Sequence, residues 1–279
     1  MQPATDPLLG ALLPEGYRIS QLLRSGGTSR VYLGVGVARA PESPEPHDEG
    51  PIAPVAVKIL RPELARSPEN LAAFEHQASV ALRVSHPNVL RVLARGALPS
   101  GIPYLVSELL RGLDLADTLA RARRLAPRRA VPIARSLASG LGAAHQQGIL
   151  HLDLKPENIF LVHAPDGRET PKLLDFGPPF GRGTPGYRAP EIERGAEGSV
   201  ASDIYSLGVV LYEMLTGALP DSAAPAGEPS SSVSASIPAP LRATLARALA
   251  ADPLDRFASA SELDQSLEVA AGHLDAPFY

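Results

Sequence analysis

No cysteine occurs among the 279 residues of this chain. Disulfide bonds, catalysis by a thiolate and zinc sites with cysteine ligands are therefore excluded. The absence of cysteine does not determine the redox compartment, and the cytosol is the simplest expectation for the location of the protein.

The chain also lacks a strong excess of charge of either sign, because its formal net charge is -4 and its isoelectric point is near 6.0. This balance provides no general attraction to nucleic acid or to an anionic membrane, so any recognition of phosphate must be local. We therefore expect no nucleic-acid partner and no membrane partner.

Signals for export and membrane insertion are missing as well. The first residues, MQPATDPLLGALLPEG, contain no basic region and are interrupted by proline, which is not typical of a secretory signal. The longest strongly apolar stretch, 204–215, includes Tyr205, Tyr212 and Glu213 and is shorter than the roughly 20 residues of a membrane span. This stretch predicts a buried helix, and we expect the protein to be cytoplasmic.

Strand patterns dominate the first third of the chain. Residues 17–37 have strand character with a break at Gly26 and Gly27, and VAVKIL at 55–60 is rich in β-branched residues, so a β-hairpin is expected. The proline-rich, acidic segment between them predicts a solvated loop at 38–54. The other elements predicted in this part are a helix at 68–84 and strands at 89–93 and 104–107.

Beyond Gly112 the sequence becomes rich in alanine and leucine with helical periodicity. The predicted helices are 113–123, 128–147, 200–216, 240–250 and 258–271. A strand-rich part followed by a helix-rich part is typical of an α+β fold in two lobes. The predicted organisation is an N-terminal extension at 1–14, a β-rich N-lobe at 15–108, an α-helical C-lobe at 109–271 and a tail at 272–279.

The segment HLDLKPEN, residues 151–158, concentrates three kinds of polar group. A carboxylate (Asp153), a cation (Lys155) and an amide (Asn158) follow Ile149 and Leu150, which we interpret as the end of a buried strand. Such a cluster indicates that a charged molecule is bound nearby. The alternative interpretation is a loop of ordinary solvated charges.

Five motifs occur in order along the chain: SGGTSRVY, VAVK, HLDLKPEN, LLDFG and GTPGYRAPE. Together they resemble the eukaryotic-like serine/threonine protein kinases of bacteria, and the resemblance covers residues 17–271. One of these motifs alone is weak evidence, whereas five in the expected order argue against an unrelated fold. The resemblance implies a bilobal protein-kinase fold, with ATP and Mg²⁺ as cofactors.

The resemblance also implies a role for each matching residue. Asp153 would orient the acceptor hydroxyl or accept its proton, Lys155 would contact the transferred phosphate, and Lys58 would hold the α- and β-phosphates. Asn158 and Asp175 would hold Mg²⁺. The other nucleotide-binding positions implied are Gly26, Gly27, Val31, Glu108 and Leu110.

Further matches concern substrate class and architecture. Lys155 together with Thr184 resembles serine/threonine rather than tyrosine kinases. Glu191 and Arg256 match a buried ion pair of the family, and Asp203 matches a carboxylate that braces the catalytic loop. The latter three are expected to be structural rather than catalytic.

The chain departs from the family pattern at two places that affect nucleotide binding. Gln77 stands where the family carries a glutamate that pairs with the strand lysine, and Glu75 would point about 200° away around the helix. Arg24 and Ser29 stand where the family has the first and third glycines of its glycine-rich loop. We therefore expect Lys58 to be less firmly positioned and the activity to be reduced.

Regulation departs from the family pattern too. Leu152 replaces an arginine that binds a phosphate on the activation loop in many relatives, and the segment PPFGRG at 178–183 contains no hydroxyl group. Activation by loop phosphorylation is therefore not expected. The segment 220–237 is short and polar, which predicts curtailed substrate docking.

These observations favour an ATP-dependent kinase that acts on serine or threonine of a protein substrate and does not depend on activation-loop phosphorylation. The alternatives are a pseudokinase that binds nucleotide or acts as a scaffold, and a kinase-like enzyme for small molecules. A regulatory protein is a further expected partner. The sequence does not indicate the substrate, the pathway, the regulator or the oligomeric state.

Overall fold

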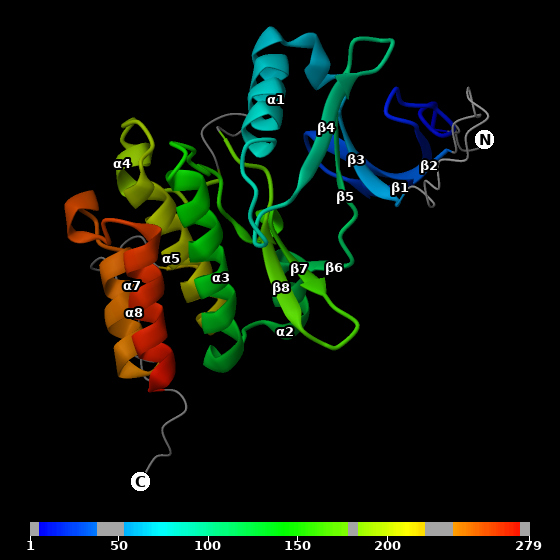
Figure 1. Ribbon diagram of the computed structural model, residues 1–279. Helices are drawn as coiled ribbons and strands as arrows, with labels where there is room; N and C mark the ends of the chain where they lie inside the picture. Colours follow the sequence, from blue (N-terminus) through cyan, green and yellow to red (C-terminus); the bar gives the residue numbers. More distant parts are fainter. Residues whose placement is uncertain (1–5, 38–52, 178–183, 221–236, 274–279) are drawn as a thin grey trace. The chain divides into compact units, whose positions relative to one another are not determined.

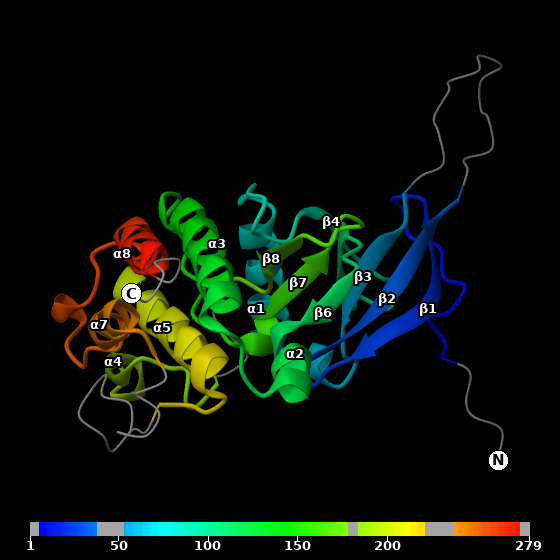
Figure 2. The same cartoon turned by 90° about the horizontal axis from the view of Figure 1, so that it is seen from below.

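The structure is a computed structural model that describes residues 6–37, 53–177, 184–220 and 237–273. It contains two compact units, which are described separately (Figures 1 and 2). The strand-rich unit comprises the chain up to Arg83 together with Arg91–Leu110. The helix-rich unit comprises Val84–Leu90 and the chain from Arg111 onward. The predicted loop at 38–54, the segment PPFGRG and most of 220–237 lie outside the described residues.

The strand-rich unit is built on one antiparallel sheet with the strand order β1-β2-β3-β5-β4. The predicted strands in 17–37, at 55–60 and at 104–107 are confirmed. The strand predicted at 89–93 begins later, because Val89 instead bridges Leu173 of the helix-rich unit. The strands are β1 (Tyr17–Ser25), β2 (Ser29–Gly36), β3 (Val55–Leu60), β4 (Val92–Ala97) and β5 (Pro103–Glu108).

One face of this sheet carries the unit's hydrophobic core, which includes Tyr32, Val57 and Tyr104. The N-terminal segment 6–16 covers this core, since Leu13 is 2% exposed within it. Two buried hydroxyl groups hold the segment: Tyr32 donates to Asp6 at 2.8 Å, and Tyr104 donates to Glu15 at 2.9 Å. Buried tyrosines need such acceptors, because an unpaired buried hydroxyl is costly.

The predicted helix at 68–84 is confirmed as α1 (Pro68–Ala81), which follows the short 3₁₀-helix η1 (Leu64–Arg66). Ser67 caps its N-terminus by accepting from the N–H of Asn70 at 3.4 Å, and Pro68 occupies the first helical position. Both features are typical helix starts.

The helix-rich unit packs α3 against α5 and α8 (Figures 1 and 2). The helix α5 is almost entirely buried. It begins with a capping box at Ser199 and ends at Gly217, whose backbone is left-handed. All five predicted helices of this unit are present. The helices are α2 (Leu115–Ala122), α3 (Pro127–His145), α4 (Pro190–Glu193), α5 (Val200–Thr216), α7 (Ala239–Ala248) and α8 (Ala260–Gly272).

A small antiparallel sheet in the same unit was not predicted from the sequence. Its strands are β6 (Gly112–Asp114), β7 (Ile159–His163) and β8 (Glu169–Leu173). The strand expected at Ile149–Leu150 is absent, and both residues instead belong to an irregular segment after α3. The segment 151–158 therefore connects α3 to β7 and includes the 3₁₀-helix η2 (Pro156–Asn158).

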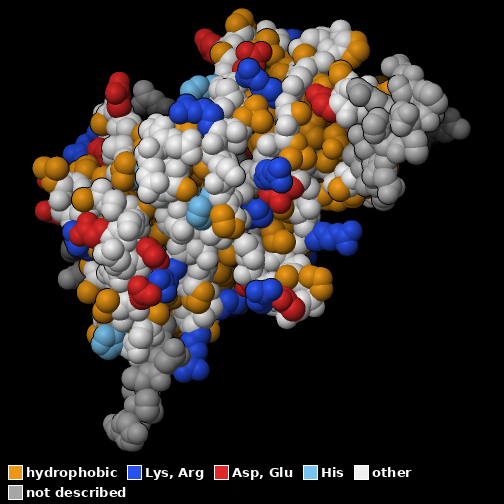
Figure 3. All heavy atoms as spheres, in the orientation of Figure 1, with side chains coloured by type: hydrophobic (Ala, Val, Ile, Leu, Met, Phe, Trp, Pro, Cys, Tyr) orange, Lys and Arg blue, Asp and Glu red, His pale blue; other side chains and the backbone are white. Residues whose placement is uncertain are grey.

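Within the described ranges, no helix combines the length and the apolar character that crossing a bilayer requires. Figure 3 shows acidic and basic side chains interspersed over the visible face of the helix-rich unit. That face presents no broad field of a single sign, in agreement with the modest net charge of -4.

Candidate active site

The carboxylate of Asp153 is the centre of a dense polar cluster in the helix-rich unit. Lys155 Nζ lies 2.9 Å from one carboxylate oxygen, and Thr184 Oγ1 donates to the other at 3.1 Å. The N–H of Thr184 donates to that second oxygen at 3.2 Å, and Lys155 Nζ also donates to Thr184 Oγ1 at 2.6 Å. The carboxylate is 13% exposed, so it remains accessible while its orientation is determined by its neighbours.

Asn158 joins this cluster from η2. Its Nδ2 group donates to the backbone oxygen of Asp153 at 2.8 Å and to the carboxylate at 3.2 Å. The backbone oxygen of Asn158 accepts from the N–H of Leu174 at 2.9 Å. This bond places Leu174, and with it the adjacent Asp175, beside the segment 151–158. Because the amide nitrogen faces Asp153, the amide oxygen is the group left to coordinate a cation.

Asp175 itself has a left-handed backbone with φ of 57°. This conformation is unusual for a residue with a side chain and is often found at functional sites. Its neighbour Phe176 is buried and packs against the ring of His151 with 4.6 Å between ring centroids.

The predicted brace by Asp203 is present. Its carboxylate, 1% exposed, accepts from the N–H groups of His151 at 2.8 Å and Leu152 at 2.9 Å and lies 2.8 Å from Nε2 of His145. These bonds anchor the start of the segment 151–158 to the buried helix α5. They thereby restrain Asp153, which directly follows Leu152.

The predicted ion pair of Glu191 and Arg256 is also present. Two guanidinium nitrogens each lie 2.7 Å from a different carboxylate oxygen, and the Arg256 side chain is fully buried. Burial alone would raise the pKa of Glu191, but the hydrogen bonds and charge of Arg256, together with hydrogen bonds from the backbone and from Ser202, outweigh it and hold the pKa below its usual value.

Leu152, which replaces the expected arginine, has a left-handed backbone with φ of 61°. Its side chain packs directly against Gly198, where a Cβ atom would overlap with the leucine. The glycine therefore provides the space that the leucine occupies.

The strand-rich unit brings Lys58 beside Val31. The two residues are paired across β3 and β2, and opposed residues of an antiparallel pair point to the same face. This face is opposite to the core face, since the neighbouring residues Tyr32 and Val57 are fully buried in the core. Leu105 of β5 pairs with Lys58 on its other side.

Two of the predicted nucleotide-binding positions, Glu108 and Leu110, lie at and beyond the end of β5. Glu108 is the last residue of this strand, and its carboxylate accepts from the N–H of Arg91 at 2.8 Å. Ser107 is 7% exposed and donates to the backbone oxygen of Glu108 at 3.3 Å. Leu110 is the last residue of this unit.

Gln77 is 8% exposed on α1, whereas Glu75 on the same helix is exposed. This difference agrees with the predicted separation of the two side chains around the helix. Glu75 does not occupy the buried position that the family pattern assigns to glutamate.

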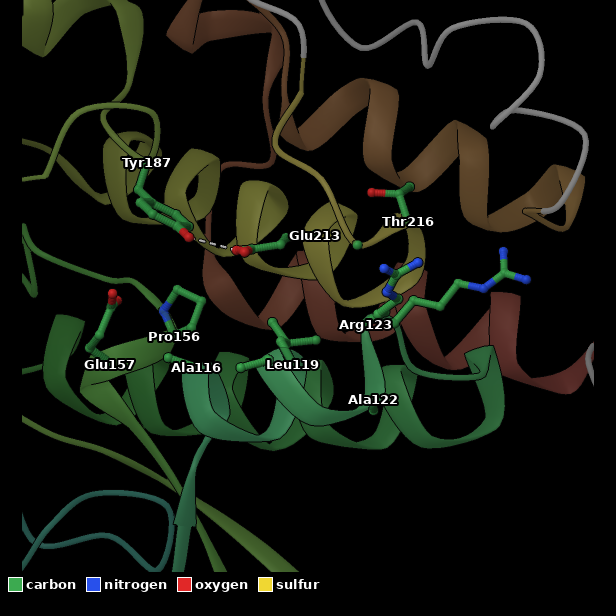
Figure 4. A pocket seen from close by; sticks show the side chains of 12 residues that line it. Ala116, Leu119, Ala122, Arg123, Pro156, Glu157, Tyr187, Glu213 and Thr216 are labelled. Atoms are coloured by element: carbon green, nitrogen blue, oxygen red, sulfur yellow. Dashed lines mark hydrogen bonds between the residues drawn. The ribbon is translucent and has the colours of Figure 1, made fainter.

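A pocket of about 820 Å³ lies next to the segment 151–158 within the helix-rich unit. Figure 4 shows α2 on one side and the end of α5 on the other, with Pro156 and Glu157 from the loop. Tyr187 donates to Glu213 at 2.6 Å inside this pocket. Burial raises the pKa of Glu213, the hydrogen bond from Tyr187 opposes this shift, and the nearby charge of Glu157 adds to it.

The lining of this pocket thus includes two carboxylates, Glu157 and Glu213, and two arginines, Arg123 and Arg124. A cation beside the two carboxylates would relieve their mutual repulsion. Sequence analysis missed this pocket, because its wall combines segments separated by about a hundred residues.

The predicted site residues therefore form two groups. Asp153, Lys155 and Asn158 lie together in the helix-rich unit, with Asp175 linked through Leu174. The strand-rich unit carries Lys58 and Val31 as neighbours and Gly26, Gly27, Glu108 and Leu110 at the ends of its strands.

Known proteins with similar sequences and structures fit this geometry. The chain matches the family model described as “Protein kinase domain” over residues 47–237. It is 39% identical over 221 residues to “Serine/threonine-protein kinase PkaB” of Streptomyces coelicolor, a match that covers 73% of this chain and 49% of that protein. It is 35% identical over 272 residues to “Serine/threonine-protein kinase PknJ” of Mycobacterium tuberculosis, covering 88% of this chain and 44% of that protein. The chain thus spans less than half the length of these two curated relatives.

Among solved structures, the chain is similar to the kinase domain of Mycobacterium tuberculosis PknI. The TM-score is 0.74 at 30% sequence identity, and the match covers 94% of this chain and 98% of that domain.

Proposed function

Because this chain belongs to the protein kinase family, among the eukaryotic-like serine/threonine kinases of bacteria, we propose that it transfers the γ-phosphate of ATP to serine or threonine hydroxyls of a protein. The observation that carries this proposal is the polar cluster around Asp153. A carboxylate, an ammonium group and an amide oxygen are the groups that phosphoryl transfer requires.

In the proposed reaction, the acceptor hydroxyl oxygen forms a bond to the γ-phosphorus while the bond from that phosphorus to the β–γ bridging oxygen breaks. The hydroxyl proton passes to the carboxylate of Asp153, and ADP leaves. Lys155, 2.9 Å from that carboxylate, stabilises the negative charge on the transferred group. Thr184 holds the carboxylate in position through its hydroxyl and N–H groups.

The donor set of Asn158 and Asp175 fits a magnesium ion. Both supply oxygen ligands, which Mg²⁺ prefers, and few protein ligands suffice when phosphate oxygens complete the coordination. The observation that supports the fit is the amide nitrogen of Asn158, which bonds to Asp153 and leaves the amide oxygen for the metal. Bound there, Mg²⁺ neutralises phosphate charge.

For the nucleotide, we assign the phosphates to Lys58 and to the backbone of Gly26 and Gly27. The apolar side chain of Val31, opposite Lys58 on the same face of the sheet, would contact the adenine ring. Backbone groups of Glu108 and Leu110 would bond to the edge of the ring.

We further propose that activity does not depend on phosphorylation of the activation segment. Leu152 fills the space beside Gly198 in place of an arginine that could bind a phosphate. The segment PPFGRG, which lies outside the described residues, offers no hydroxyl to phosphorylate.

The second candidate function is a pseudokinase that binds nucleotide or partners without catalysis. The observation in its favour is Gln77, an uncharged residue that is 8% exposed at the position of the expected glutamate. A pseudokinase would retain the fold and the ion pair of Glu191 with Arg256 but would not transfer phosphate.

Incubation of the purified chain with γ-labelled ATP, Mg²⁺ and a basic protein substrate tests the proposal. We expect incorporation of label into serine or threonine that is lost in Asp153→Asn and retained in Asp166→Asn, a control with the same change at an exposed position. A folded wild-type chain that incorporates no label above the level of Asp153→Asn would instead support the pseudokinase.

A further inference from the structure

The turn between β1 and β2 contains the two consecutive glycines of the chain's glycine-rich motif. The N–H of Gly26 donates to the backbone oxygen of Ser29 at 2.9 Å and closes the turn. A Cβ atom at Gly27 would meet no atom within 4 Å, and neither glycine has a backbone in the left-handed region. The fold of the turn therefore does not itself require glycine, and space is left beside the backbone for a ligand.

A single arginine outside the motif bonds to this turn at three points. Arg61, the first residue after β3, donates from Nε to the backbone oxygen of Gly26 at 2.7 Å. Its Nη2 group donates to Ser25 Oγ at 3.0 Å. Its own N–H donates to the backbone oxygen of Thr28 at 3.0 Å. The planar guanidinium thus holds the start of the turn while the backbone holds its end.

These bonds change the energetics of ligand binding at the turn. Glycine loses more conformational freedom on ordering than any other residue, so a ligand that had to order Gly26 and Gly27 would bind more weakly. A turn that is already ordered before the ligand arrives removes this cost. The family pattern has three glycines here, whereas Arg24 and Ser29 replace two of them in this chain.

We propose that Arg61 is a positioning residue for the nucleoside triphosphate: its bonds to Ser25 and Gly26 hold the β1–β2 turn in the conformation that receives the phosphates. This inference rests on the proposed ATP-dependent function. Arg61 acts through the turn and through the positive charge it brings to the turn's base, and it is not assigned a direct contact with the reacting atoms.

The sheet itself does not depend on the Arg61 side chain. The strands β1, β2 and β3 are paired along their lengths by backbone hydrogen bonds, from Tyr17 with Gly36 to Ser29 with Leu60. Replacing Arg61 by alanine should therefore leave the fold intact and loosen only the turn. This separates a positioning role from a role in folding.

The variants are Arg61→Ala, Arg61→Lys, Ser25→Ala and the control Arg66→Ala, which removes one positive charge from an exposed position in η1. The readouts are the Kd for ATP by calorimetry and the exchange rate of the turn amides in the nucleotide-free chain. Because one part-buried and one exposed hydrogen bond are lost, we expect Arg61→Ala to weaken ATP binding about three- to tenfold and to speed amide exchange in the turn. Arg66→Ala should change neither quantity.

Two comparisons separate geometry from charge. Arg61→Lys keeps the charge but cannot bond to both Ser25 and Gly26, so its Kd should lie between those of wild type and Arg61→Ala. If Ser25 acts through Arg61, the double variant Ser25→Ala/Arg61→Ala should bind ATP no more weakly than Arg61→Ala alone.

The outcomes distinguish this inference from the proposed function. An Arg61→Ala chain that binds ATP like wild type would overturn the inference alone, even if its amides exchanged faster. A Kd for Arg61→Lys equal to that of wild type would overturn the geometric role in favour of charge alone. Failure of the wild-type chain to bind ATP would overturn the proposed function, and with it this inference.

Discussion

Arg256 and Glu191 are joined by two hydrogen bonds of 2.7 Å in the interior of the helix-rich unit. The pair connects α4 to the segment after η3 (Pro253–Asp255), so elements distant in sequence depend on it. Removing one partner of such a pair leaves the other charge buried without compensation.

Glu191→Gln should therefore destabilise the chain by about 3–5 kcal/mol, measured by urea denaturation at pH 7. The double variant Glu191→Gln/Arg256→Met should recover part of this loss, because no buried charge remains. An unchanged unfolding midpoint in Glu191→Gln would contradict the assignment of the pair as a structural element.

The same pair predicts a pH dependence. The folded-state pKa of Glu191 is held below its usual value, so its contribution to stability is fully present above the pKa of the unfolded chain. That contribution is lost as the pH falls through the folded-state pKa. Wild type should lose stability on the acid side, and Glu191→Gln should lose less over the same range.

His151 is completely buried, and neither of its ring nitrogens has a hydrogen-bond partner within the described part of the chain. His151→Phe keeps a ring against Phe176 and removes the unpaired polar atoms, so it should stabilise the chain by about 1–3 kcal/mol in denaturation experiments. Loss of stability in this variant would mean that a ring nitrogen has an essential partner.

His151 also predicts acid sensitivity of the folded chain. Burial lowers the pKa of His151, so its neutral form stabilises the fold above the unfolded pKa of about 6.5. This contribution is lost as the pH falls from there towards the folded-state pKa. Unfolding midpoints at pH 7.5 and 5.5 should differ less for His151→Phe than for wild type.

Gly198→Ala should destabilise the chain by up to about 1 kcal/mol, because the new Cβ atom would displace the end of the Leu152 side chain. Shortening the leucine in Gly198→Ala/Leu152→Ala should restore part of the stability. Gly142→Ala is the matched control, since its Cβ would make only an ordinary contact of 3.9 Å with Ala260. That helical substitution should stabilise the chain by up to about 1 kcal/mol.

Gln77→Glu should raise kcat/KM for phosphotransfer if the missing charge at this position limits the activity. A glutamate there would position Lys58 more firmly through a charge-assisted hydrogen bond. Glu75→Gln, which changes an exposed residue of the same helix, should have no effect. An unchanged or lower rate in Gln77→Glu would show that Gln77 does not act on the lysine.

Glu213→Gln should reduce kcat/KM for a peptide substrate with an arginine near the acceptor serine and leave the alanine version of that peptide unaffected. The reason is the electrostatic attraction of Glu157 and Glu213 in the pocket beside the catalytic loop. Burial raises the pKa of Glu213. As the pH falls, this carboxylate should therefore lose its charge, and with it the preference for the arginine peptide, at a higher pH than an exposed glutamate would. Equal losses for both peptides would exclude recognition of a basic side chain.

Much of the fold follows from local patterns in the sequence. The strand character of 17–37 and 55–60 predicted strands of the first sheet, and the apolar run 204–215 predicted the buried helix α5, as observed. The small sheet of β6, β7 and β8 escaped prediction, because its strands are short and are stabilised by pairing with one another rather than by local propensity.

For the candidate site too, local motifs predicted some features and contacts between distant residues decided others. The five motifs, in order along the chain, were sufficient to indicate the family. The link of Arg61 to Gly26 gave no sequence signal, because it joins residues 35 positions apart.

The sequence by itself determined which chemical groups are present and where the long helices and most strands of the first sheet lie, because those depend on residue identity and on contacts between near neighbours. Only the tertiary structure decided how the groups are held: Asp153 between Lys155 and Thr184, and Leu152 in the space left by Gly198. Such contacts depend on distances between segments remote in the chain, and no local periodicity encodes these distances.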